Sequence, residues 1–193
     1  FIGVTAAATA ALANGGDGVT FHNGAYANTV GGTGAGARNV LSGNGGSGVS
    51  IRTGCAGNEI QGNHIGVNAA GDAALPNGEE GIEINASNTV VGGSDSGAGN
   101  IISGNAGSGI HVLSGANTTG TIILGNFIGL NAAGDAAVPN NLAGIYVQDA
   151  DENYIGGAEA GAGNVISGNG NAGIVFEYSS DNQVYGNFIG SNA

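Results

Sequence analysis

Basic residues are almost absent from this chain. It has no lysine, and Arg38 and Arg52 are its only arginines, against fourteen acidic residues and a formal net charge of −12. A protein that binds nucleic acid or an anionic membrane surface needs a basic patch to neutralise phosphates. We therefore expect no nucleic-acid partner.

Long apolar runs and cysteine pairs are also missing. No apolar stretch reaches the 18 residues of a membrane-spanning helix, so we expect no membrane insertion. No secretory signal is recognisable, and because the chain begins inside a repeat we expect it to be processed or excerpted. Cys55 is the single thiol. It either pairs between chains or is a small unpaired turn residue, and we favour the second interpretation.

Glycine is abundant, with 42 of 193 residues, and it accompanies a long repeat. The tripeptide Phe/His-Ile-Gly begins at Phe1, His64, Phe127 and Phe188, at spacings of 63, 63 and 61 residues. Self-similarity at a fixed period is typical of a solenoid. The sequence predicts one domain over 1–193, with units of approximately 1–63, 64–126 and 127–188 and the start of another coil at 189–193.

Each unit contains two cycles, and each cycle has the motifs Asn-x-(Ile/Leu), Gly-(Ile/Val)-x-(apolar) and Asn-x-(Ile/Val) in fixed order. Short alternating apolar segments bounded by Gly and Asn predict three strands per cycle and exclude helices for most of the chain. Stacking the cycles pairs each strand in parallel with its equivalent. The fold class is therefore all-β, a three-sided parallel β-helix of about six coils that alternate between long and short.

The apolar columns predict the core. One wall combines the two apolar positions of the glycine-led motif, from Val19 and Phe21 to Ile174 and Phe176. The second wall is predicted to contain Val30, Ile60, Val90, Ile123, Ile155 and Val184, and the third Ile2, Leu41, Ile65, Ile102, Ile128, Ile166 and Ile189.

Asparagine also recurs in columns. Stacked side-chain amides bond to each other and to turn backbone, so we interpret the columns as structural ladders, with a row that binds an ion or a sugar as the alternative. One predicted column is Asn39, Asn63, Asn100, Asn126, Asn164 and Asn187; a second is Asn44, Asn68, Asn105, Asn131, Asn169 and Asn192; the third motif begins at Asn28, Asn58, Asn88, Thr121, Asn153 and Asn182.

The long coils carry two insertions beside the Ile-Gly strand. The outward positions of this strand are unusually apolar for a solvent face. The loops either fold over these residues or leave a contact surface for another chain, and we predict loop cover. The outward column is Phe1, Val40, His64, Ile101, Phe127, Val165 and Phe188.

Acidic residues do not form a repeated catalytic pattern. A polysaccharide-active enzyme uses a pair of carboxylates about 5 to 10 Å apart. The candidates fall in different registers, and the three histidines His22, His64 and His111 occupy unrelated positions, so we predict no enzyme and no catalytic residues. The carboxylates considered are Glu83, Asp149, Asp151, Glu152, Glu177 and Asp181.

Calcium is the one cofactor for which the sequence offers candidate ligands. The repeated Asn-Ala-Ala-Gly-Asp loop offers Asn68 with Asp72, and Asn131 with Asp135, as oxygen ligands. One carboxylate per loop is few, and we favour a role for both aspartates in capping the loop. We therefore expect no cofactor, with Ca²⁺ as the alternative.

The motif NxIGGxxxGxGNxISGNxxxGIxI, followed by NxIxGNxIGxNxxGxxAxxN, resembles the repeats of bacterial extracellular and cell-surface proteins. The resemblance covers essentially all of 1–193. It implies a right-handed β-helix, an extracellular or cell-surface location and a structural or adhesive role, and it carries no catalytic residues.

The two ends share one register, since Phe1-Ile2 at the start corresponds to Phe188-Ile189 at the finish. Heterologous contacts that do not close produce filaments. We expect copies to stack head to tail in a filament, sheath or surface layer. The alternatives are the β-helical stalk of a larger adhesin, or a polysaccharide-binding or polysaccharide-degrading protein. Asn85 and Asn117 begin Asn-x-Ser/Thr sequences, which occur by chance in so Asn-rich a chain.

Overall fold

A computed structural model of the chain describes residues 1–34, 36–113 and 118–191. The described residues contain eighteen strands of two to four residues and no helix. No segment in this part of the chain could therefore cross a membrane as a helix. Asn117 and Asn192 lie outside the described residues.

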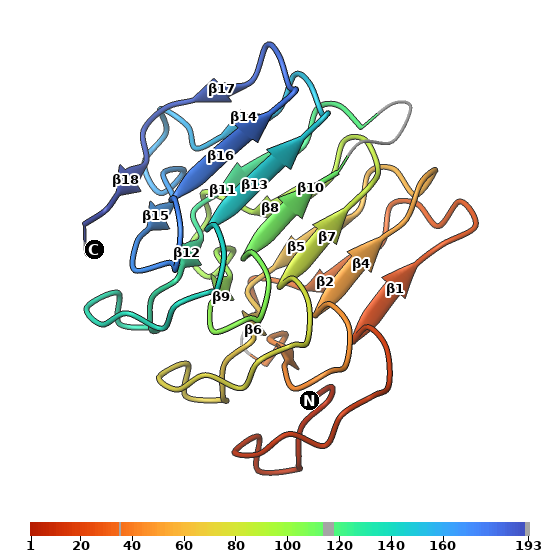
Figure 1. Cartoon of the computed structure of the whole chain (residues 1–193), viewed down its shortest axis with the longest axis vertical. Helices are drawn as coiled ribbons and strands as arrows, with labels where there is room; N and C mark the ends of the chain where they lie inside the picture. The colour runs from red at the N-terminus through yellow and green to blue at the C-terminus, as the bar shows by residue number, and fades with distance from the viewer. Residues whose placement is uncertain (35, 114–117, 192–193) are drawn as a thin grey trace.

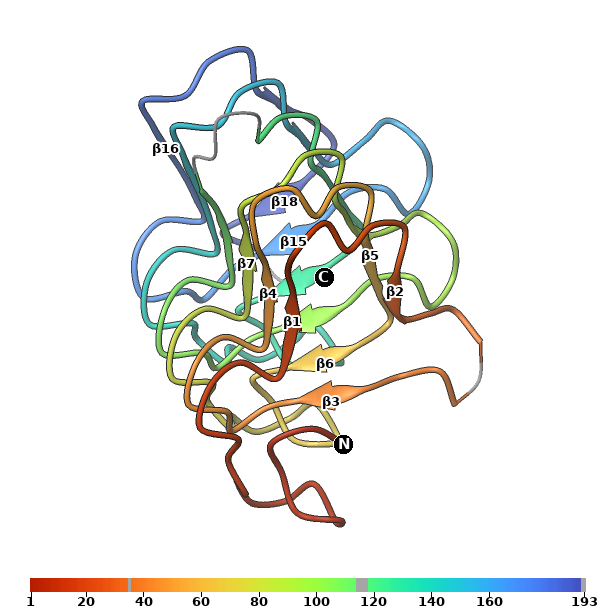
Figure 2. The ribbon, with the colours of Figure 1, turned by 90° about the vertical axis from the view of Figure 1, so that its right-hand side faces the viewer.

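Three parallel sheets of six strands wind around one axis, and each coil contributes one strand to each sheet (Figures 1 and 2). In spatial order the first sheet contains β1 (Val19–Phe21), β4 (Val49–Ile51), β7 (Ile82–Ile84), β10 (Ile110–Val112), β13 (Ile145–Gln148) and β16 (Ile174–Glu177). The second contains β17 (Gln183–Val184), β14 (Tyr154–Ile155), β11 (Ile122–Leu124), β8 (Val90–Gly92), β5 (Glu59–Gln61) and β2 (Thr29–Gly31). The third contains β18 (Phe188–Ile189), β15 (Val165–Ile166), β12 (Phe127–Ile128), β9 (Ile101–Ile102), β6 (His64–Ile65) and β3 (Val40–Leu41).

The core follows the predicted columns, which confirms the three-sided parallel β-helix. The first and third walls are aligned as expected, for example Val49 beside Ile82 and Ile102 beside Ile128. Along the second wall the choice of Val90 was wrong. Val91 pairs with Ile60 and Ile123 and is fully buried, because the preceding turn shifts this strand by one residue.

Two asparagine columns run the length of the coils. Asn63, Asn100 and Asn126 are successive members of the first, and each donates its side-chain amide to the oxygen of the next. The second column is wrong at Asn68 and Asn131, because the inserted loop begins at these residues and the coil resumes only where the loop ends. The members of the second column are Asn14, Asn44, Asn77, Asn105, Asn140 and Asn169.

The third column is interrupted. Asn28 bonds to Asn58 and Asn153 bonds to Asn182, but Thr89 and Thr121 fill the two places between these pairs. The prediction of Asn88 as a member of this column is wrong, because the one-residue shift that puts Val91 in place of Val90 also puts Thr89 in place of Asn88. Both threonine hydroxyls are buried without a hydrogen-bond partner. The column is thus a continuous ladder only at its two ends.

The inserted loops cover the third sheet, as predicted. Each begins as a small antiparallel hairpin, with bridges at Val4 to Ala11, Val67 to Ala74 and Leu130 to Ala137. Val4 and Ala8 from the first loop form a buried cluster with Val40 of β3. In Figure 1 these hairpins project in one row beside the coils. Loop cover explains why the outward positions of this sheet are apolar.

Candidate functional site

The C-terminal end face exposes side chains that the other coils bury. Phe176, Val184 and Ile189 continue the three inward columns, yet they are 42%, 41% and 50% exposed. Their partners in the preceding coil, among them Ile155 and Ile166, are fully buried. The predicted end residue Phe188 is also exposed. This face is therefore an apolar surface edged by three strands.

The N-terminal end face differs from it. Phe1 is exposed, and Ile2 is half-buried because it bridges Leu41 of β3. Phe21 and Val30, which continue the inward columns on this side, are buried. The two faces therefore have the same strand register, but the apolar core side chains are exposed mainly on the C-terminal face. The N-terminal face presents mostly strand edges.

The first sheet lies toward the viewer in Figure 1. Its outward positions carry charged and aromatic side chains, among them Glu83, His111 and Tyr146 in one register. Arg52 bridges Asp17 at 3.2 Å and Glu83 at 3.0 Å. Burial raises the pKa of the Glu83 carboxyl, although the positive charge of Arg52 opposes that shift. This cluster joins three coils.

Further along the same face, His111 stacks on Tyr146 with ring centroids 4.6 Å apart. The Tyr146 hydroxyl donates a hydrogen bond to Glu177, and this bond raises the pKa of the tyrosine. His111 also lies 3.7 Å from Glu80. These contacts tie β10, β13 and β16 together from outside.

The acids considered as catalytic candidates occupy different places. Glu83 lies beside His111 on the neighbouring strand. Glu177 lies beside Gln148, two residues further along the strand than Tyr146, which shares the register of His111. The other four lie in the turns that follow the first sheet, and Asp151 there accepts a hydrogen bond from the backbone of Ser180. The remaining three are Asp149, Glu152 and Asp181.

The calcium candidates bond to one another. Asn68 donates to the Asp72 carboxylate at 2.7 Å and accepts from its backbone at 3.1 Å. Asn131 and Asp135 repeat this pair at 2.8 and 3.1 Å. The geometry is that of a loop held closed by its own side chains. The acids that group most closely in the described residues are instead Glu79, Glu80 and Glu83.

Cys55 and Asn85, which the sequence analysis also considered, can now be placed. Cys55 is a fully buried free thiol in the main core cluster, which matches the interpretation as a small unpaired residue. Asn85 is half-buried, whereas Asn117 lies outside the described residues.

His64 is buried under the second loop, where its Nδ1 lies 3.3 Å from the Asn68 carbonyl oxygen. Burial lowers the pKa of the imidazole, and the charge of Arg38 lowers it further, while hydrogen bonds to the backbone at Asn68 and Ala69 oppose the shift. The neutral ring fills a place that Phe127 fills one unit later. His64 is thus a packing residue of the loop.

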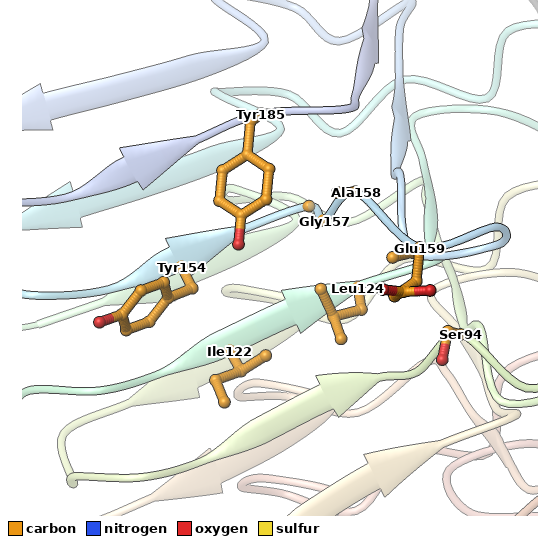
Figure 3. Close-up of a pocket in the computed structure, with 10 residues that line it drawn as sticks. Ser94, Ile122, Leu124, Tyr154, Gly157, Ala158, Glu159 and Tyr185 are labelled. Carbon is orange, nitrogen blue, oxygen red and sulfur yellow. The ribbon is translucent and has the colours of Figure 1, made fainter.

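The outer face of the second sheet contains a hollow of about 400 Å³ (Figure 3). Leu124, Gly156, Gly157 and Tyr185 are among the residues that line it. Tyr154 and Ile122 stand in the neighbouring column. The turn after β14 closes one side with Ala158 and Glu159, and Ser94 stands at the rim.

Sequence reasoning did not find this hollow, because it considered only the inward positions of the second sheet. The signal is present in the outward positions. Leu124, Gly156 and Tyr185 follow successive inward residues of one column, and an added Cβ at the next residue, Gly157, would lie 3.7 Å from the Leu124 side chain.

Comparison of the chain with protein-family profiles, curated proteins and solved structures gives no match. The geometry itself defines the class of protein, a three-sided parallel β-solenoid with asparagine ladders at its corners.

Proposed function

We propose that this protein is a structural β-solenoid that works outside the cell and stacks end to end with copies of itself. The observation that carries the proposal is the C-terminal end face, where Phe176, Val184 and Ile189 are exposed although their columns are buried in the coils below. Covering an apolar side chain of this size stabilises by roughly 1.5 to 3 kcal/mol. A second copy is the occupant whose coil has the matching three-sided shape.

The strand edges support the same occupant. β16, β17 and β18 are the last strands of their sheets in the described residues, and β1, β2 and β3 are the first. A strand edge is a template for another strand. The N-terminal edge of one copy would extend all three parallel sheets of another in register, and such a contact repeats without closing.

The chemistry of the rest of the molecule agrees with a structural role. Core and amide columns continue from coil to coil, and the ion pairs and rings outside the first sheet cross-link coils. The extracellular location rests on the resemblance of the repeat to bacterial cell-surface proteins. A filament, sheath or surface layer is the assembly that we expect.

Sedimentation velocity and electron microscopy over a range of concentrations test the proposal. The wild-type chain is expected to form longer particles as concentration rises. Ile189→Glu places a charge in the contact and is expected to abolish them. Leu142→Glu is the matched control, because it adds the same charge to an exposed apolar residue on the side of the solenoid.

Single particles at the highest soluble concentration would contradict self-stacking and favour a stalk whose next coil belongs to the same chain. Equal loss of association in both glutamate variants would show that charge, and not the end face, controls the assembly.

A further inference from the structure

The hollow on the second sheet has two partly exposed tyrosines in its lining. Tyr154 and Tyr185 are 36% and 44% exposed and lie on adjacent coils. On the third sheet, by contrast, loops bury Val40 and His64. The inserted loops therefore do not cover the two tyrosines of the second sheet.

The shape of the hollow suits a small cyclic molecule. Its volume of about 400 Å³ lies in the usual range for small-molecule sites. Figure 3 shows the Tyr185 ring extending over the strands toward Tyr154, with Ile122 and Leu124 on the coil below. Two aromatic rings and two aliphatic side chains thus line the hollow, next to Gly156 and Gly157.

The polar groups are few and lie at the edge. The tyrosine hydroxyls, the Ser94 hydroxyl and the Glu159 carboxylate are placed around the hollow. Tyrosine combines an apolar ring with a hydrogen-bonding end, which suits a ligand that is wet on one side. A pyranose ring has this character, since its C–H face packs on apolar groups while its hydroxyls donate and accept.

Charge decides between classes of sugar. Glu159 is the charged residue in the lining, and neither arginine of the chain is among the lining residues. With a net charge of −12, the protein repels an anionic ligand. We propose that this hollow binds a neutral saccharide.

Isothermal titration with neutral oligosaccharides of glucose, galactose, mannose and N-acetylglucosamine tests the proposal, with polygalacturonate as the anionic comparison. We expect at least one neutral sugar to bind and polygalacturonate to bind more weakly. Tyr154→Ala and Tyr185→Ala are each expected to weaken that binding about tenfold. Tyr178→Ala is the control, because Tyr178 is exposed and lies outside the hollow.

Melting temperatures of the three variants establish that each is folded. Glu159→Gln keeps the shape of the rim and removes its charge, so it is expected to narrow the preference for neutral over anionic sugar. The proposal is overturned if none of the neutral sugars binds, if polygalacturonate binds best, or if Tyr178→Ala weakens binding as much as Tyr154→Ala. These outcomes leave end-to-end stacking untouched.

Discussion

The inward asparagines use every hydrogen-bonding group of their amides. Asn100 is fully buried and donates to the Ile60 carbonyl at 2.8 Å and to Asn126 at 2.9 Å. Its oxygen accepts from both the backbone and the side chain of Asn63. A buried polar group costs stability only if it is left unpaired. These residues therefore make the corners of the coil polar at no net penalty.

Asn100→Asp is expected to lower the free energy of unfolding by about 3 kcal/mol, because a carboxylate of the same shape cannot donate either bond. Urea unfolding at neutral pH measures the loss. Asn141→Asp, at an exposed position, is the control and is expected to change stability little. Equal effects of the two substitutions would contradict a role for the ladder.

His64 is expected to make stability depend on pH. Its folded-state pKa is lowered from the ordinary value of 6.5. The unfolded chain therefore takes up a proton at a higher pH than the folded chain does. The stability that His64 contributes is fully present above about pH 6.5 and is lost as pH falls toward its lower folded pKa.

His64→Phe, which introduces the residue found at Phe127, is expected to flatten the decline in unfolding free energy between about pH 7 and pH 5.5. The exposed His22 provides the comparison, and His22→Phe is expected to leave the decline in place. If the unfolding free energy of His64→Phe declined with pH as steeply as that of the wild type, this explanation would be wrong.

At the scale of elements, the inserted hairpins form a second layer that connects coils. The backbone N–H of Ala132 in the third loop donates to Gly71 in the second at 2.8 Å, and Ala69 in the second loop donates to Ala8 in the first. The layer follows the long coils only, because the short coils have no such insertion. The alternation of coil length is thus the origin of the cover.

Gly71 allows this layer to approach the sheet. It has φ of +73°, and an added Cβ would lie 2.8 Å from that of Ala132 and 2.9 Å from the His64 ring. Gly24 has φ of +78° and open space around it. Gly71→Ala is therefore expected to cost about 2 kcal/mol more than Gly24→Ala in chemical unfolding. Equal losses of unfolding free energy in Gly71→Ala and Gly24→Ala would mean that the positive φ alone, and not the close packing around Gly71, causes the loss.

Strands and walls were predictable, whereas turn lengths were not. Alternation identifies the inward residues wherever a single apolar residue follows the turn. In Thr89-Val90-Val91 two valines fit the pattern, and only the length of the turn decides between them. Asn68 and Asn77 pose the same problem, because they stand at the two ends of the inserted loop, and only the hairpin shows which one returns to the core.

At the scale of the whole molecule, the shape of the end faces and the net charge of the chain have opposite expected effects on association between copies. In the proposed stacking, the apolar side chains of the C-terminal end face would favour contact between copies, while a charge of −12 on each copy would repel the next. The end residues Phe188 and Ile189 were predictable from the repeat, because they fall in its register. The hollow was not, because its lining combines outward side chains of neighbouring coils with the turn that follows β14.

Association is expected to increase with ionic strength for this reason. At about 1 M salt the screening length is about 3 Å, so repulsion between copies is largely removed while apolar burial remains. Sedimentation velocity at low and high salt, at one protein concentration, measures the change. A decrease in particle length with added salt would show that charge pairs, and not the apolar end face, hold the copies together.

The asparagine columns also have a direction. In every described bond between their side chains, the earlier coil donates and the later coil accepts, as from Asn39 to Asn63 and from Asn164 to Asn187. Each column is therefore a row of aligned dipoles, with a free acceptor side toward its first coil and a donor side toward its last. Two like ends would set donors against donors. Growth of such a rod would be vectorial, with the two tips chemically distinct at every length.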